Sequence, residues 1–181
     1  MKKIILSAAV IAFGFSFGQK KEISAAFKAI EANDTATANT QIGAADAILG
    51  GKTYLLEPTI LEQYYYGKGL GLLNTGKVSE GAEVLANITA LGKSKIYVGK
   101  NAEKQKVYYV GKQAADASGV ANLKEETYAP TLVGNLGAKI NPLLTKANEE
   151  AIAAYNAKNH EKKKKKFLEV YNLLAAAGSE D

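Results

Sequence analysis

The hydrophobic periodicity of the chain is the feature that most constrains its fold. Apolar residues recur every three or four positions in three long segments, and each segment is interrupted once by a short polar stretch. That period is typical of an amphipathic α-helix, and a brief polar break is typical of a turn between two helices. The pattern predicts three helical hairpins, at residues 22–49, 58–91 and 142–177. The expected turns lie at residues 33–34, 75–77 and 158–159.

Proline, asparagine and glycine indicate where these helices begin and end. Pro58 and Pro142 suit the first turn of a helix, where the missing N–H is not needed. Asn141, immediately before Pro142, is a good N-cap. Gly50 follows an apolar run, where a left-handed residue commonly ends a helix. The third hairpin is therefore expected to begin at Asn141.

Small and large residues alternate at helical spacing along the second hairpin. Small residues let two antiparallel helices approach closely, while large ones fill the space beside them. The positions concerned are Tyr65, Gly69, Leu72, Gly76, Gly81, Leu85 and Ile88. This order of aromatic, small, large, turn glycine, small and large residues resembles the tetratricopeptide repeat. The resemblance implies a mainly all-α protein, a short solenoid of helical hairpins.

The other two hairpins match the repeat pattern in part. The first has Ala26 and Ala38 at the small packing positions, whereas the third has Lys163 where a small residue is expected. The family period is about 34 residues. The matching positions begin further apart than that, at Glu22, Tyr65 and Ala147. The additional residues must therefore lie in the connections between hairpins.

The resemblance also implies a binding surface, because the first helices of such repeats line a concave groove. The matching positions in this chain are Phe27, Ile30, Tyr66, Leu70, Asn74, Ile152, Tyr155 and Asn156. Aromatic side chains and Asn amides suit an extended peptide or a helix of a protein partner. Some of these side chains could instead be buried against the segment that follows the second hairpin, residues 92–140, and the sequence leaves both interpretations open.

The segment between the second and third hairpins, residues 92–140, differs in character from its flanks. Residues 96–98 and 107–110 are rich in β-formers, with a polar stretch between them. A small β-hairpin and an extended loop packed on the helices are both consistent with this composition. The expected organisation is two hairpins over residues 19–91, this insert, and a third hairpin over residues 141–181.

The first eighteen residues have the layout of a secretory signal peptide. Lys2 and Lys3 precede an apolar run, residues 4–17, that is too short to span a bilayer. Small residues before Gln19 suit cleavage there. We therefore expect an exported protein, periplasmic or secreted, whose mature chain has no transmembrane segment.

Residue types exclude several classes of function. Every basic side chain is Lys, and the absence of Arg argues against sequence-specific nucleic-acid binding. His160 is the single histidine and there is no Cys, so no metal site or cofactor is expected. No paired general acid and base and no marked nucleophile appear, so the chain is not expected to be an enzyme.

Two features near the C-terminus suggest further interactions. Five consecutive lysines, which cover every face of a helix, form either a solvated surface or a site for anionic glycan or lipid: Lys162, Lys163, Lys164, Lys165 and Lys166. The helix that follows has a broad apolar surface, formed by Phe167, Leu168, Val170, Tyr171, Leu173 and Leu174. Solenoids usually end in a polar-faced helix. The apolar surface therefore indicates either association with another molecule or subunit, or a shortened version of a longer repeat array.

The sequence thus supports three hypotheses. The first is an exported, non-catalytic scaffold that binds a protein or peptide in a helical groove. The second is a structural or assembly protein that self-associates through its last helix. The third is a protein that binds anionic surfaces through the lysine run.

Overall fold

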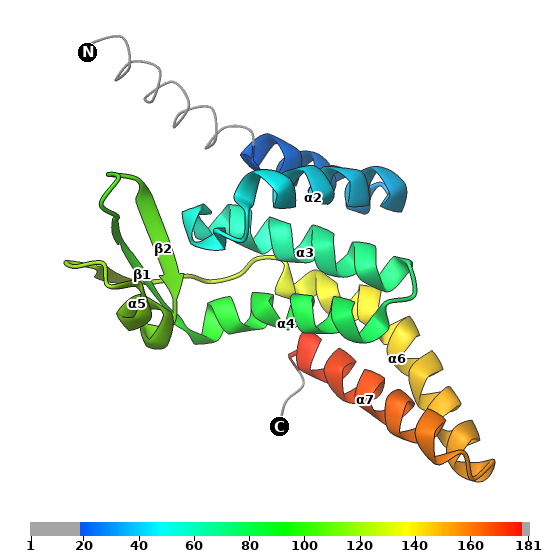
Figure 1. Cartoon of the computed structure of the whole chain (residues 1–181). Helices are drawn as coiled ribbons and strands as arrows, with labels where there is room; N and C mark the ends of the chain where they lie inside the picture. The colour runs from blue at the N-terminus through cyan, green and yellow to red at the C-terminus, as the bar shows by residue number, and fades with distance from the viewer. Residues whose placement is uncertain (1–18, 179–181) are drawn as a thin grey trace.

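A computed structural model describes residues 19–178, and most of these residues are helical (Figure 1). Antiparallel helical hairpins form the body, and a small three-stranded antiparallel sheet is inserted between the second and third of them. The expected fold class, helical hairpins with a small β-hairpin insert, is therefore confirmed. The proposed signal peptide lies outside the described residues.

The first hairpin joins a helix over residues 19–31 to α2 (Thr35–Leu49). In the turn, Asn33 has a φ of 60°, and the Asp34 side chain accepts a hydrogen bond from the Thr37 N–H at 3.0 Å. This bond satisfies one of the N–H groups that a helix start leaves without an intrahelical partner. At its other end, α2 stops at Gly50, whose left-handed φ of 54° agrees with the expectation. A short 3-10 helix, η1 (Thr53–Leu55), leads to the second hairpin.

The second hairpin consists of α3 (Pro58–Asn74) and α4 (Val78–Lys93), which approach each other closely at two glycines. A Cβ placed on Gly69 would lie 2.5 Å from Leu85 Cγ. A Cβ placed on Gly81 would lie 2.7 Å from the Gly69 carbonyl oxygen. Neither position has room for a side chain, so the small residues set the distance between the two helices.

The insert contains β1 (Lys95–Lys100), β2 (Lys106–Val110), α5 (Lys112–Ser118) and β3 (Lys124–Thr127). The strands are antiparallel in the order β2–β1–β3, and Ile96 of β1 pairs with Val110 on one side and Glu126 on the other. Ile96 and Val98 are buried in a core that also contains Leu61 and Leu91 of the helices. This contact covers one face of a sheet that would be marginal alone.

The third hairpin consists of α6 (Val133–Asn156) and α7 (His160–Ala176), and its start differs from the sequence expectation. Pro142 lies inside α6, so Asn141 is not an N-cap. A proline inside a helix costs about 3 kcal/mol. Here Leu136 and Ile140 are fully buried before the proline and Ala147 is buried after it, so one apolar stripe continues across it. Burial of that stripe outweighs the lost backbone hydrogen bond.

Two apolar clusters hold the body together. One contains α3, α4, the first half of α6 and the end of α7, and the other joins the first hairpin to the sheet. The far end of the α6–α7 hairpin extends beyond both clusters and projects from the body (Figure 1). Within residues 19–178, no helix is both long and apolar enough to cross a membrane.

Candidate functional site

Four of the eight groove positions implied by the repeat pattern lie in or against the protein core. Ile30, Tyr66 and Leu70 are buried, and Phe27 is partly buried with its ring 5.6 Å from that of Tyr66. The first half of α6 belongs to the same cluster and contributes Leu136, which is fully buried. In this arrangement these side chains are covered by the chain itself, which was one of the two interpretations that the sequence left open.

The four remaining groove positions are exposed, one on α3 and three on α6. Asn74, at the end of α3, donates a hydrogen bond to Thr35 at 3.0 Å. Ile152 and Tyr155 lie on α6 and are 50% and 63% exposed, and Asn156 follows them at the end of the helix. The exposed part of the implied groove is thus concentrated on the third hairpin.

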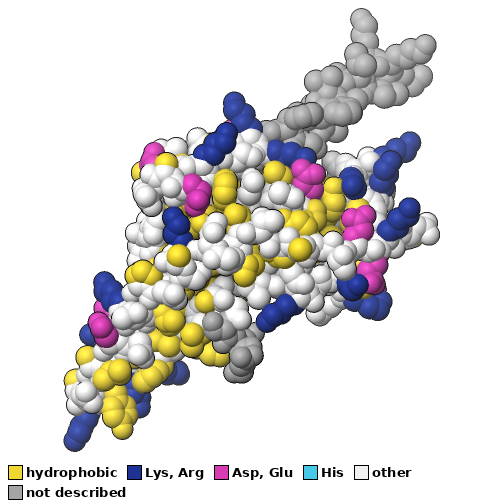
Figure 2. All heavy atoms as spheres, turned by 180° about the vertical axis from the view of Figure 1, so that it is seen from behind, with side chains coloured by type: hydrophobic (Ala, Val, Ile, Leu, Met, Phe, Trp, Pro, Cys, Tyr) yellow, Lys and Arg dark blue, Asp and Glu magenta, His cyan; other side chains and the backbone are white. Residues whose placement is uncertain are grey.

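Three large apolar side chains of α7 are also exposed, and none of them was among the groove positions. Phe167, Leu168 and Tyr171 are 45%, 52% and 63% exposed. Among residues 19–178, the large apolar side chains that remain exposed all lie on α6 and α7. Figure 2 shows hydrophobic side chains gathered along this hairpin, with lysines around them. The apolar run on the last helix was the sequence signal for this surface.

Helical spacing places these side chains in one stripe on each helix. Phe167 and Tyr171 are four residues apart on α7, on the side opposite the buried Leu173. Ile152 and Tyr155 are three residues apart on α6. We call the surface formed by Ile152, Tyr155, Phe167, Leu168 and Tyr171 the hairpin face.

The five consecutive lysines do not behave alike. Lys166 is partly buried and forms ion pairs with Glu150 and Glu169, both at 2.7 Å. Partial burial opposes its charge, but these bonds raise the pKa of Lys166 above its ordinary value. The Lys163 ammonium lies 5.5 Å from the centre of the Tyr155 ring, a cation–π contact that joins α7 to α6.

Lys162, Lys164 and Lys165 are exposed to solvent, so only part of the run is engaged within the protein. Close by, a hollow of about 430 Å³ lies at the end of the hairpin and is lined by Tyr155, Lys158, His160 and Lys163, among others. The end of the hairpin is thus basic, and the hairpin face runs from it toward the body.

The buried carboxylate of Glu62 is satisfied by partners within the protein. Glu62 of α3 is 1% exposed, and it accepts hydrogen bonds from the Leu132 N–H and the Tyr128 hydroxyl, both at 2.6 Å. Burial, followed by the bond to Glu62, raises the pKa of Tyr128 to about 12. Since both carboxylate oxygens are engaged, Glu62 holds the chain between β3 and α6 in place.

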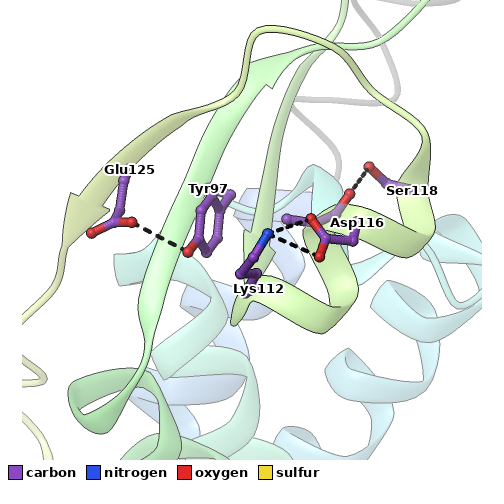
Figure 3. A network of polar contacts seen from close by, with 6 residues as sticks. Tyr97, Lys112, Asp116, Ser118 and Glu125 are labelled. Carbon is purple, nitrogen blue, oxygen red and sulfur yellow. Dashed lines mark hydrogen bonds and ion pairs between the residues drawn. The ribbon is translucent and has the colours of Figure 1, made fainter.

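A second polar network lies on the surface of the insert (Figure 3). The Tyr97 hydroxyl of β1 donates to Glu125 of β3 at 3.2 Å, and Lys112 of α5 contacts both carboxylate oxygens of Asp116 at 3.0 Å. Figure 3 places Tyr97 between Glu125 and Lys112. These contacts connect β1 to β3 and stabilise α5, and none of them presents an activated nucleophile.

Comparison with known proteins finds no family model, no curated protein and no solved structure that matches the chain. The resemblance to the tetratricopeptide repeat therefore depends on the residues alone. Within residues 19–178, no group of three or more acidic or histidine side chains is arranged to hold a metal ion.

Proposed function

We propose that the protein is an exported, tetratricopeptide-like scaffold that binds a protein or peptide partner without catalysing a reaction. The partner contacts the hairpin face. This surface differs from the groove implied by the repeat pattern, although Ile152 and Tyr155 belong to both.

The observation that carries this proposal is the grouping of the exposed large apolar side chains on one projecting hairpin. Single exposed apolar residues are common, but a contiguous group on one element marks an interaction site. Two tyrosines and a phenylalanine are among the side chains that contribute most to protein interfaces. Their exposure is unfavourable in water, and a partner that covers them would remove that cost.

The proposal predicts that partner capture depends on this face. We expect the purified protein to retain a specific polypeptide from the cells that produce it, and a Phe167→Ser/Tyr171→Ser variant to lose it. Both side chains are already exposed, so the free energy of unfolding should change by no more than about 1 kcal/mol for the two substitutions together. The measurement is affinity capture followed by mass spectrometry, with circular dichroism to verify the fold.

A Lys52→Ser/Lys100→Ser variant is the matched control, because it changes two exposed residues near the sheet. It should retain the same polypeptide as the unchanged protein. Equal capture by all three proteins would contradict the proposal, and a shift from dimer to monomer in the face variant would favour self-association instead.

The native protein should also begin at Gln19, and an intact leader would contradict export.

A further inference from the structure

We propose that the partner segment is an amphipathic helix rich in acidic residues, which lies lengthwise on the hairpin face with its carboxylates at the basic end. This inference depends on the proposed function and names the chemistry of the partner. It combines three observations on the same hairpin: the two apolar stripes, the distribution of charge, and the hollow at the end.

The apolar stripes suit a helix better than an extended strand. Each stripe follows the axis of its own helix, and the helices are antiparallel neighbours. The surface between two parallel ridges of side chains accepts a third helix, whose residues at positions i, i+3, i+4 and i+7 fill it. An extended strand could not form main-chain hydrogen bonds with this surface, because the backbone groups of both helices are already bonded within the helices.

Positive charge is concentrated at the end of the hairpin. Residues 157–168 contain six Lys and one Glu, a formal charge of +5, and one of these lysines, Lys166, is paired with Glu150 and Glu169. Without Lys2 and Lys3 of the expected leader, the remainder of the chain has a formal charge of −2. An acidic partner is attracted to this end and oriented by it, whereas a basic one is repelled.

The hollow at the end gives the carboxylates a place to bind. Its volume of about 430 Å³ exceeds that of an acidic side chain, and Lys158, His160 and Lys163 contribute polar groups to its lining. Lys163 is already positioned over the Tyr155 ring, so less side-chain freedom is lost when a carboxylate binds there. The hollow and the hairpin face share Tyr155, which makes them one continuous surface.

Other occupants fit these observations less well. A second copy of the protein would carry the same excess of lysines to the interface. An anionic membrane would contact the lysine-rich end of the hairpin. Tyr171 is the residue of the hairpin face that lies furthest along α7 from that end, so a membrane bound there would leave it uncovered. A helical segment placed lengthwise contacts both the lysines and the full apolar stripe.

Synthetic peptides of about 18 residues, or five helical turns, test the inference directly. Each has Leu at helical spacing and a single residue type elsewhere: Glu in the first peptide, Gln in the second and Lys in the third. Binding to the purified protein is measured by fluorescence anisotropy at about 50 mM and 500 mM NaCl, where screening differs strongly. We expect the Glu peptide to bind at least about tenfold more tightly than the other two at low salt, and to lose that advantage at high salt.

Variants assign the effect to the two parts of the surface. Lys158→Gln/Lys163→Gln should weaken binding of the Glu peptide by about tenfold, equivalent to about 1.4 kcal/mol. Lys52→Gln/Lys100→Gln removes the same charge near the sheet and should have little effect. Phe167→Ser/Tyr171→Ser should weaken binding of every peptide.

Four outcomes would overturn the inference. If the Glu and Gln peptides bind equally and both depend on Phe167 and Tyr171, the acidic chemistry is wrong while the proposed function stands. If no peptide binds but phosphatidylglycerol vesicles do, through Lys158 and Lys163, the site is for lipid and the proposed function fails as well. If the protein dimerises through the hairpin face, the occupant is a second copy. If no peptide binds, no vesicle binds and the protein remains a monomer, no acidic segment is recognised there.

Discussion

A Gly81→Ala variant is expected to lose about 2 kcal/mol of unfolding free energy, although alanine is the better helix former. The added Cβ would lie 2.7 Å from the Gly69 carbonyl oxygen and 2.9 Å from Leu73. A backbone oxygen cannot move away by a change of rotamer as a side chain can. The helices α3 and α4 must therefore separate at the centre of the larger apolar cluster. For a domain of this size, the melting temperature should fall by about 4–8 °C. The melting temperature is measured by thermal unfolding, monitored by circular dichroism.

Gly43→Ala is the matched control. Gly43 also lies in a helix, but a Cβ there meets nothing within 4 Å. This variant should gain about 0.5–1 kcal/mol from propensity alone. If both variants shift stability in the same direction, the close approach of α3 and α4 is not what requires the glycine.

A Glu62→Ala variant is expected to lose about 3 kcal/mol, the largest effect we anticipate for a single side chain. The change leaves the Leu132 N–H and the Tyr128 hydroxyl without their acceptor inside the protein. The connection between β3 and α6 should loosen before the helical body unfolds. Hydrogen exchange should therefore rise most in residues 128–135, and denaturant unfolding gives the free energy.

Two further variants separate the hydrogen bonds from general packing. Glu62→Gln retains an oxygen that can accept from Leu132, so it should lose only about 1 kcal/mol. Tyr128→Phe removes one donor, and combining it with Glu62→Ala should cost less than the sum of the two single changes. Strict additivity would show that Glu62 and Tyr128 do not interact, contrary to the geometry.

The helical part of the fold follows from the sequence because its signals are local. Turns at Asn33 and Gly76 and the small residues of the second hairpin act within a few residues or between adjacent helices. The start of α6 could not be predicted from the residues around Pro142. The helix continues across this proline because Leu136 and Ile140, which precede it, are buried by other elements of the fold. The strand β3 also escaped prediction, since its four residues are all exposed and it forms only by pairing with β1.

The candidate site could be predicted only where its sequence signals are local. The lysine run and the apolar side chains of α7 are visible in the sequence as local features. Whether an apolar residue is covered depends on distant elements. Tyr66 is buried in a cluster that includes the first half of α6, whereas Tyr155 projects beyond the body. The repeat pattern alone assigns both tyrosines to the groove.

Photo-crosslinking can show whether the hairpin face contacts another polypeptide in the cell. A photoreactive phenylalanine analogue replaces Tyr171 in the producing cells, and a second version carries the analogue at Ala47, an exposed position on α2. Our account predicts a crosslink from position 171 to a different polypeptide, at an acidic amphipathic segment, and no such product from position 47. No adduct at position 171, or the same adducts from both positions, would contradict the claim that this face binds a partner.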